Sequence, residues 1–333
     1  MTRYFITFPT GTSDIVQKVL TENHIAVEEI SDGIAVIATD KKPRDIEEFG
    51  FITHVYLLIA QTIFNDSIEK TVDSLKTESF RIPASFFRGR NFKVRVSYKG
   101  QTVSFDKEAL DGLEKRIAHN YKLRLDPEGK CNEFWFYIRE NKNTYFGLKL
   151  TDTKARDIAR KKGQLQSGIG AVMVSMAKIQ PSAVVMDPFC GSGGISDEII
   201  RVPFKQLIIS DINDGAVRLL KKKYSSNAKV KIRHGDYRSL SIPRDSVDCI
   251  ITDPPWGEFG KGIDLQEMTH SFRMWLKPNG KLIILISINL HEELVRTLKL
   301  SGFKVLNAYG TLVGGNKAKI IEARKCPHEL LTP

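Results

Sequence analysis

The chain has few cysteines and no long apolar run. Its four cysteines, Cys131, Cys190, Cys249 and Cys326, stand far apart, without a C-x-x-C pair or a nearby histidine. This spacing argues against a zinc site and against a disulfide framework, so we expect no metal. The N-terminus has no apolar stretch of signal-peptide length, and the longest apolar run, Val55–Ala60, is too short to cross a bilayer. We therefore expect a cytoplasmic protein in a reducing compartment.

The common phosphate-binding motifs are also absent from the sequence. A glycine-rich turn, Asp187–Gly194, reads D-P-F-C-G-S-G-G. No Lys-Ser/Thr pair follows it, so it is not a Walker loop, and the adjacency of its last two glycines does not fit G-x-G-x-x-G. The turn begins with an acid, which would repel a pyrophosphate but can hold a cationic or zwitterionic ligand. This distinction points away from NAD and ATP.

Positive charge, in contrast, is in excess. The 50 Lys and Arg residues against 39 Asp and Glu leave a formal net charge of +11, which favours a polyanionic partner. Eleven basic and four acidic residues lie between Arg81 and Arg124, and they supply +7 of this charge. Within this stretch Phe92–Val96 alternates as a strand does, with its cations opposite the apolar face. We expect a phosphate backbone to bind here. An ordinary solvated face is the alternative.

The pattern of expected elements changes near residue 150. Residues 4–62 alternate short strands and helices, as in a small α+β layer, and two further strands are expected at Phe134–Arg139 and Tyr145–Leu150. Residues 151–170 are polar, charged and glycine-containing, as linkers are. Beyond them strands and helices alternate, with seven strands in total and a hairpin formed by the last two. In this half Leu276–Gly280 is expected to form a turn that closes a helix.

Four successive strands of the second half each end in a carboxylate. Asp187 follows Val184–Met186, Asp211 follows Leu207–Ser210, Asp236 follows Val230–Arg233, and Asp253 follows Val247–Thr252. The carboxyl ends of parallel strands lie at the edge where doubly wound sheets bind their ligands. The spacing of Asp211 after the glycine-rich turn matches the acid that holds ribose hydroxyls in nucleotide-binding folds. This arrangement predicts a shared site for an adenosine-type ligand.

The last of these acids opens the sequence Asp253–Trp256, D-P-P-W. Neither proline can donate to a sheet ladder and each fixes its own φ, so the strand ends in a stiff loop. The loop offers a carboxylate, carbonyl oxygens and an aromatic plane. This set suits a flat heterocycle with an exocyclic NH2, because the plane can stack on the ring while the oxygens accept the amine hydrogens. A strand end that merely contains these residues is the alternative.

These motifs together resemble a known family. The second half resembles the S-adenosylmethionine-dependent methyltransferases of the Rossmann-like class, through Asp187–Gly193, Asp211, Asp236 and Asp253–Trp256. The first half resembles the ferredoxin-like plus THUMP arrangement of tRNA-modifying enzymes. The combination is similar to the THUMP-containing tRNA guanine-N2 methyltransferases, which include enzymes acting at position 6 and at position 10. Trp256 departs from the Tyr or Phe of many members.

The resemblance implies an α/β fold with a C-terminal Rossmann-like seven-stranded methyltransferase domain and an N-terminal α+β ferredoxin-like and THUMP region. The expected domains are a ferredoxin-like domain at 1–62, a THUMP RNA-binding domain at 63–151, a linker at 152–170 and the methyltransferase domain at 171–333. S-adenosyl-L-methionine is the implied cofactor, tRNA is the implied partner, and N2-methylguanosine at position 10 or 6 is the implied product.

The resemblance and the charge pattern together nominate three sets of residues. The expected cofactor-binding residues are Asp187, Phe189, Gly191, Ser192, Gly193, Asp211, Ile212, Asp236 and Tyr237. The expected RNA-binding residues are Arg88, Arg90, Lys93, Arg95, Lys161 and Lys162. The expected catalytic residues are Asp253, Pro254, Pro255 and Trp256. Asp253 and the Pro254 carbonyl would accept the two N2 hydrogens of a flipped-out guanine, on which Trp256 stacks.

Three other functions are compatible with parts of this pattern. An adenine-N6 or cytosine-N4 methyltransferase is the first, because D-P-P-W serves those amines equally well. An RNA-binding protein with a vestigial methyltransferase fold is the second, and the intact acids and glycine-rich turn argue against it. A sulfur-transfer enzyme is the third, but the ATP-binding loop is missing from the sequence. Mono- versus dimethylation, a monomeric state and the need for a small activating protein stay open.

Overall fold

A computed structural model describes residues 1–75, 82–104, 108–129, 131–152, 165, 167–256 and 263–327. The chain divides into two compact units. Unit 1 consists of Met1–Thr7, Leu20–Glu48 and Ile52–Thr153, and unit 2 consists of Phe8–Val19, Phe49–Phe51 and Lys154–Pro333. The expected division into a domain at 1–62 and a domain at 63–151 stays a prediction. Strands from both stretches share one sheet, so the sheet does not mark a boundary between them.

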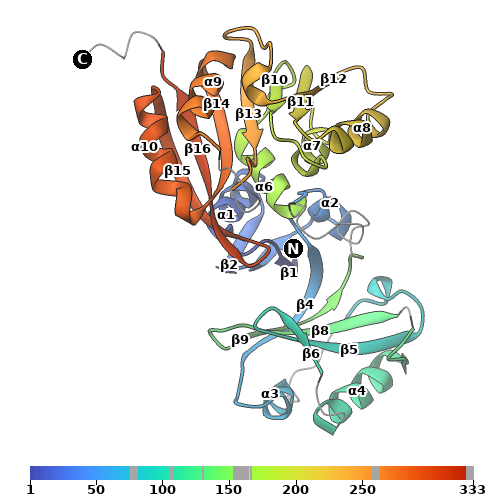
Figure 1. Cartoon of the computed structure of the whole chain (residues 1–333). Helices are drawn as coiled ribbons and strands as arrows, with labels where there is room; N and C mark the ends of the chain where they lie inside the picture. Colours follow the sequence, from blue (N-terminus) through green and yellow to red (C-terminus); the bar gives the residue numbers. More distant parts are fainter. Residues whose placement is uncertain are drawn as a thin grey trace. The chain divides into compact units, whose positions relative to one another are not determined.

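Unit 1 is built on a nine-stranded sheet (Figure 1). Its strands are β1 (Thr2–Thr7), β2 (Ala26–Ser31), β3 (Ile34–Thr39), β4 (His54–Ile63), β5 (Asn91–Tyr98), β6 (Gln101–Val103), β7 (Arg124–Leu125), β8 (Asn132–Ile138) and β9 (Asn143–Lys149). They lie in the order β2-β3-β1-β4-β9-β8-β5-β6, and β7 pairs with β5. The helices of the N-terminal half are α1 (Ser13–Glu22), α2 (Pro43–Glu47), α3 (Ile68–Ser74), the 3-10 turn η2 (Ala84–Phe86) and α4 (Glu108–Tyr121).

Aromatic rings from strands that are not neighbours pack together on one face of the unit 1 sheet. Strands β8 and β1 are separated by β9 and β4, so a flat sheet would hold them about 14 Å apart. The ring centroids of Tyr137 on β8 and Phe5 on β1 are nevertheless only 5.7 Å apart. Phe5 also stacks on Tyr56 at 4.4 Å, and both rings are fully buried. Aromatic side chains therefore form the centre of this hydrophobic cluster.

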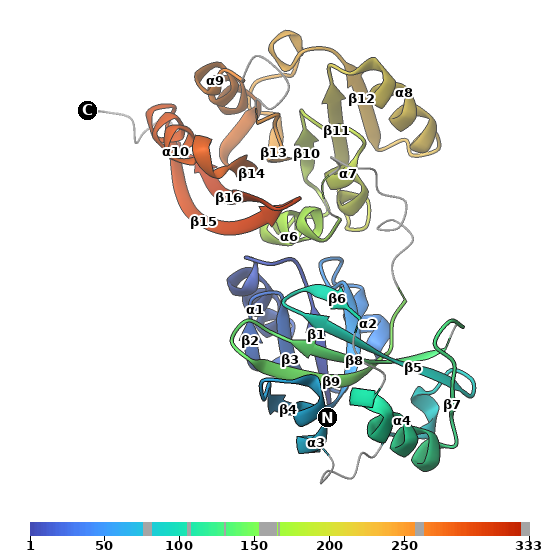
Figure 2. The same ribbon diagram turned by 60° about the horizontal axis from the view of Figure 1, so that its bottom comes forward.

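Unit 2 contains a seven-stranded sheet, which confirms the expected strand number and the α/β fold. Its strands are β10 (Val184–Asp187), β11 (Gln206–Asp211), β12 (Val230–His234), β13 (Val247–Thr252), β14 (Leu276–Ser287), β15 (Phe303–Val313) and β16 (Asn316–Lys325). Figure 2 shows the order β12-β11-β10-β13-β14-β16-β15 from right to left. The first five are parallel, and β16 and β15 are antiparallel to their neighbours, as expected for the hairpin.

Helices cover this sheet and bury its central strands. They are α6 (Ser167–Ala177), α7 (Gly194–Ile199), α8 (Asp214–Lys223), α9 (Leu265–Trp275) and α10 (His291–Leu300), with 3-10 turns η3 (Tyr237–Ser239) and η4 (Ile288–Leu290). The apolar run Leu282–Ile286 of β14 is buried on both faces, which explains its lack of polar alternation. Among the described residues, none of the helices combines the length and the apolar character needed to span a membrane.

Several elements differ from the sequence-based expectations, among them β2, α4 and the start of β14. Strand β2 was not expected, and α4 was not expected either, because charge dominates its sequence. Leu110, Leu113 and Ile117 nevertheless lie at helical spacing, and all three are buried. The segment Leu276–Gly280 was expected to be a turn, and this was wrong, since β14 begins at Leu276. A turn-like feature survives within it, because Asn279 has a positive φ of 62°.

The chain order of the parallel strands creates a crevice. From β10 the chain runs outward to β11 and β12, then returns to β13 on the other side of β10. The loops after β10 and β13 therefore diverge, and a ligand can enter between them at the carboxyl ends of these strands.

Candidate active site

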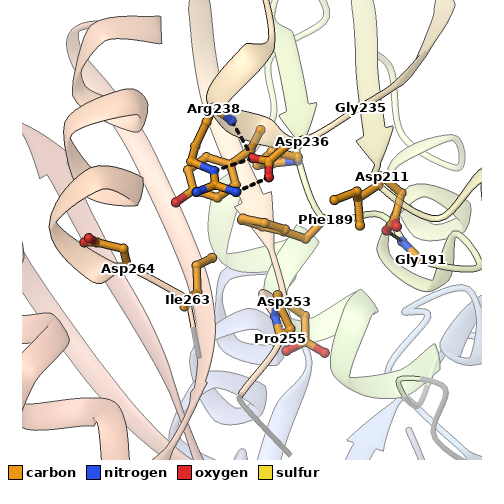
Figure 3. Close-up of a pocket in the computed structure, with 13 residues that line it drawn as sticks. Phe189, Gly191, Asp211, Gly235, Asp236, Arg238, Asp253, Pro255, Ile263 and Asp264 are labelled. Carbon is orange, nitrogen blue, oxygen red and sulfur yellow. Dashed lines mark hydrogen bonds and ion pairs between the residues drawn. The ribbon is translucent and has the colours of Figure 1, made fainter. Parts of the chain in front are cut away.

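A cavity of about 550 Å³ lies at the carboxyl ends of β10 to β13 (Figure 3). Its lining residues are Pro188, Phe189, Gly191, Asp211, Ile212, Gly235, Asp236, Tyr237, Arg238, Asp253, Pro255, Ile263 and Asp264. The cavity thus brings together residues expected to bind a cofactor and residues expected to act in catalysis. In Figure 3 the ring of Phe189 lies in the middle of these side chains. The predicted residues Asp187, Ser192, Gly193, Pro254 and Trp256 do not line it.

The glycine-rich turn is held open by the acid that ends β11. The Gly191 N–H donates to Asp211 Oδ2 at 2.7 Å, and the Asn213 N–H donates to Asp211 Oδ1 at 2.8 Å. A Cβ added at Gly191 would meet no atom within 4 Å, so the backbone here faces open space. Both glycines have a positive φ, +48° at Gly191 and +90° at Gly193, but a Cβ at Gly193 would lie 2.7 Å from Leu220. Gly191 therefore has open space beside its backbone, whereas Gly193 serves close packing.

Asp187 lies beneath this turn as a buried acid. Its side chain is 1% exposed, and Oδ1 accepts hydrogen bonds from Thr252 Oγ1 at 2.8 Å and from the Phe189 N–H at 3.3 Å. Burial raises the pKa of Asp187 to about 7 and the charge of Asp211 adds to this, while the two hydrogen bonds oppose it. Asp187 thus supports the turn from below.

Asp236 is paired with an arginine that sequence reasoning missed. The Arg238 backbone N–H and Nε both donate to Asp236 Oδ1 at 2.9 Å, and Arg238 Nη2 donates to Oδ2. These hydrogen bonds lower the pKa of Asp236, so its carboxylate is ionised at neutral pH. The next residue, Tyr237, packs its ring 5.2 Å from that of Phe189. One wall of the cavity is therefore aromatic and carries the Asp236–Arg238 ion pair.

The D-P-P-W loop leaves β13 at the opposite wall. Trp256 Nε1 donates to Asp253 Oδ1 at 3.0 Å, and the indole packs against the hydrophobic core of unit 2. Burial raises the pKa of Asp253 to about 7 and the charge of Asp187 adds to this, while the Trp256 hydrogen bond opposes it. Pro254 is buried and Pro255 is exposed. The loop thus presents Asp253 and Pro255 to the cavity.

Two further lining residues, Ile263 and Asp264, were not expected from the sequence. Asp264 caps α9, because its Oδ1 accepts from the N–H groups of Gln266 at 2.9 Å and Glu267 at 3.0 Å. An Asp directly before an apolar helical pattern is a helix-start signal, so the cap could have been found. Its place in the cavity could not, because it depends on how α9 packs against the sheet.

The predicted RNA-binding residues have varied surroundings in unit 1. Arg88 donates from Nη1 to Asp152 at 2.9 Å and from Nη2 to the Leu150 carbonyl at 2.7 Å. The Lys93 side chain is 12% exposed, and its Nζ lies 3.3 Å from Glu133. Arg90 is exposed and Arg95 is half-buried. Lys161 and Lys162 lie outside the described residues. The RNA-binding role of this set stays a prediction.

Comparisons with known proteins identify a methyltransferase domain. The family described as "Methyltransferase domain" matches residues 185–280, and that described as "RMKL-like, methyltransferase domain" matches residues 155–199. A relative from Bos taurus, U6 snRNA (guanine-N(2))-methyltransferase THUMPD2, is 32% identical over 136 residues, which is 39% of this chain. The chain spans only 27% of that relative's length.

Two further comparisons concern a relative that the chain nearly spans and a solved structure that aligns over nearly the whole chain. A relative from Methanothermococcus thermolithotrophicus, named probable tRNA (guanine(10)-N2)-dimethyltransferase, is 33% identical over 150 residues. These cover 41% of this chain and 91% of the relative. The crystal structure of TrmN from Thermus thermophilus aligns over 98% of this chain and 100% of its own, with a TM-score of 0.73. At 18% identity this likeness concerns the fold alone.

Proposed function

Because the chain belongs to the family of the tRNA (guanine-N2)-methyltransferases, we propose that it methylates the N2 atom of a guanine in tRNA. The observation that carries the proposal is the position of Asp253. Its carboxylate ends β13, beside the glycine-rich turn of β10, and both line one cavity. An amine acceptor and a cofactor-sized space therefore meet at the switch point of the sheet.

The cavity fits S-adenosylmethionine, which when bound supplies an electrophilic methyl group on a sulfonium. Asp211 would accept hydrogen bonds from the ribose hydroxyls, since each of its oxygens retains a lone pair beyond the bonds from Gly191 and Asn213. Ile212 is 68% exposed and would cover one face of the adenine, with Phe189 nearby. Open space at Gly191 leaves room for the methionyl part. Asp236, oriented by Arg238, would accept from the adenine amine.

The catalytic contribution of the chain is positioning. Asp253 Oδ1 is bonded to Trp256, and Oδ2 has no hydrogen bond in the described part of the chain, so it is available to an incoming amine. With the Pro254 carbonyl it would take the two hydrogens of guanine N2 and direct the nitrogen lone pair at the methyl group. As the carbon–nitrogen bond forms and the carbon–sulfur bond breaks, Asp253 would receive the proton released from nitrogen.

The target nucleotide has to leave the helix to reach this cavity. N2 of a paired guanine faces the minor groove, and flipping the nucleotide costs roughly a few kcal/mol. Stacking on an aromatic side chain offsets part of this cost. Trp256 is the proposed platform, with one side of its indole packed on the protein core. Position 10 is favoured over position 6 by the name of the relative that the chain nearly spans.

The test is the identity of the methylated nucleoside. Unmodified tRNA transcripts are incubated with the protein and S-adenosylmethionine carrying a labelled methyl group, then digested and analysed by mass spectrometry. We expect N2-methylguanosine, at position 10 or 6 after fragment mapping, and the same reaction distinguishes one from two added methyl groups. Appearance of the label in N6-methyladenosine or N4-methylcytidine instead would overturn the proposal. A U6 RNA transcript serves as the competing substrate, since one relative is named for it.

A further inference from the structure

Two carboxylates at the ends of neighbouring strands each accept one neutral hydrogen bond from the same short segment. Strands β10 and β13 pair with Met186 opposite Ile250. Strand β10 ends at Asp187, and Asp253 directly follows the end of β13 at Thr252. Thr252 Oγ1 donates to Asp187 Oδ1 at 2.8 Å. Trp256 Nε1 donates to Asp253 Oδ1 at 3.0 Å. Thr252, directly before Asp253, thus donates to Asp187, whereas Trp256, three residues after Asp253, donates to Asp253 itself.

The carboxylates influence each other because Asp187 is buried and Asp253 is half-buried at the edge of the cavity. Burial raises the pKa of each to about 7, and the charge of Asp187 contributes to the value for Asp253. In the described part of the chain, neither carboxylate is bonded to a cationic side chain. The other ionisable groups near these strand ends are Cys190, Asp211, Tyr224, His234, Asp236, Tyr237, Arg238 and Asp264. Arg238 is engaged by Asp236, so it does not neutralise either member of the pair.

We propose that Thr252 and Trp256 are positioning residues that keep the negative charge of this pair in place, Thr252 by holding Asp187 and Trp256 by holding Asp253 for the substrate amine. The part concerning Asp253 rests on the proposed function. The Trp256 role differs from stacking, because it uses the indole N–H and the edge of the ring. A Phe at this position would stack equally well but would leave Asp253 Oδ1 without its donor.

The arrangement has a consequence that simple packing would not produce. Loss of the Trp256 N–H removes a bond that favours the charged form of Asp253, so Asp253 takes up a proton at higher pH. Loss of the Thr252 hydroxyl has the same direct effect on Asp187. A protonated Asp187, however, no longer repels charge on Asp253, so Asp253 then loses its proton at lower pH. The two substitutions therefore move the ionisation of Asp253 in opposite directions.

The experiment is the pH dependence of single-turnover methyl transfer to tRNA by the full chain. The acid limb of this pH profile is the range in which the rate falls because Asp253 takes up a proton. Trp256→Phe should move this limb up by about half to one pH unit, the size expected for one neutral hydrogen bond. Thr252→Val, which is nearly isosteric, should move it down. Thr252→Ser retains the hydroxyl and is the matched control, with a limb like that of the wild type. The proposal would be overturned if Trp256→Phe and Thr252→Val moved the acid limb in the same direction or left it unmoved. It would also be overturned if Thr252→Ser moved the limb as Thr252→Val does.

A second measurement does not depend on RNA. S-adenosylhomocysteine binding is followed by calorimetry between pH 6 and 8 for the Thr252→Val and Thr252→Ser proteins. We expect a several-fold loss of affinity at neutral pH for Val alone. Its Asp187 is protonated more readily and then accepts a weaker hydrogen bond from the Phe189 N–H, so it supports the turn that lines the cavity less well. Equal affinity of both variants would refute the Asp187 part. A wild type that binds the probe but makes no N2-methylguanosine would refute the proposed function instead. The calorimetric measurement also tests the role of Thr252 if the Trp256→Phe protein fails to fold.

Discussion

The backbone N–H of Gly191 donates to the carboxylate of Asp211 at 2.7 Å, and this bond joins the loops after β10 and β11. The two residues are 20 positions apart in the chain. The acid thereby shapes the glycine-rich turn and, from its remaining lone pairs, faces the cavity. One side chain thus builds the site and is available to a ligand.

Substitution of Asp211 should weaken cofactor binding. Asp211→Ala removes the acceptor for Gly191 and the proposed ribose contacts, and hydrogen bonds to charged groups of this kind correspond to roughly 10-fold to 100-fold in affinity. Titration calorimetry with S-adenosylhomocysteine measures the change. Asp214→Ala is the control, because Asp214 lies on α8 and forms an exposed ion pair with Arg218 at 2.8 Å. Equal affinity of the two variants would exclude the role assigned to Asp211.

Removal of the Asp253 carboxylate should separate chemistry from binding. In Asp253→Ala the amine loses its acceptor, so we expect single-turnover methyl transfer to fall by roughly 100-fold or more. Affinity for tRNA should be nearly unchanged, as measured by filter binding. Asp253→Asn retains one acceptor oxygen without the charge, so its rate should lie between that of the wild type and that of Asp253→Ala. A parallel loss of tRNA affinity and rate would mean that Asp253 is structural.

The basic stretch of unit 1 should carry the salt dependence of tRNA binding. Replacement of Arg90 and Arg95 by Ala should lower the slope of log K against log salt by roughly 0.7 to 0.9 for each lost phosphate contact. Arg88→Ala should have a smaller effect, because Asp152 and Leu150 already engage its guanidinium. Lys115→Ala is the control, as this lysine is 76% exposed and pairs with Asp111 on α4. A slope that no variant alters would place the RNA on another surface.

Asp187 and Asp253 should make the folded protein less stable as pH rises from about 4 to about 7. The pKa values of Asp187 and Asp253 are raised from 3.8 to about 7, so the folded chain binds more protons than the unfolded chain between these limits. The free energy of unfolding therefore falls as pH rises from about 4 to about 7, by roughly a few kcal/mol for a fully buried group.

Asp187→Asn removes one of these titrating groups and provides the measurement. We expect its urea midpoint to depend less on pH over this window than that of the wild type, and to exceed the wild-type midpoint at pH 8. The lowered pKa values of Asp126 and Asp236 act in the opposite sense, but only as pH falls below about 4. A wild-type midpoint that rises between pH 5 and 8 would contradict the assignment of a proton to the buried pair.

Much of the methyltransferase half could be predicted because its signals are local. Apolar runs, prolines and glycines mark the strands and their ends, and parallel strands bring successive ends to one edge. The acids expected at this edge, Asp211, Asp236 and Asp253, do line one cavity. The helix α4 was missed because its three buried residues are outnumbered by charges, and β14 was placed too late because Asn279 and Gly280 indicate a turn.

The sequence by itself determined the family, the fold class and the places where acids and glycines end each strand, because these depend on residue type and spacing along the chain. Only the tertiary structure decided which partner each acid has: Arg238 for Asp236, Thr252 for Asp187 and Trp256 for Asp253. The reason is physical. A carboxylate's ionisation depends on burial and on donors within hydrogen-bond distance. Strand order brings Thr252 to Asp187, whereas Arg238 and Trp256 lie two and three residues from their acids and reach them through the folded conformation of each loop.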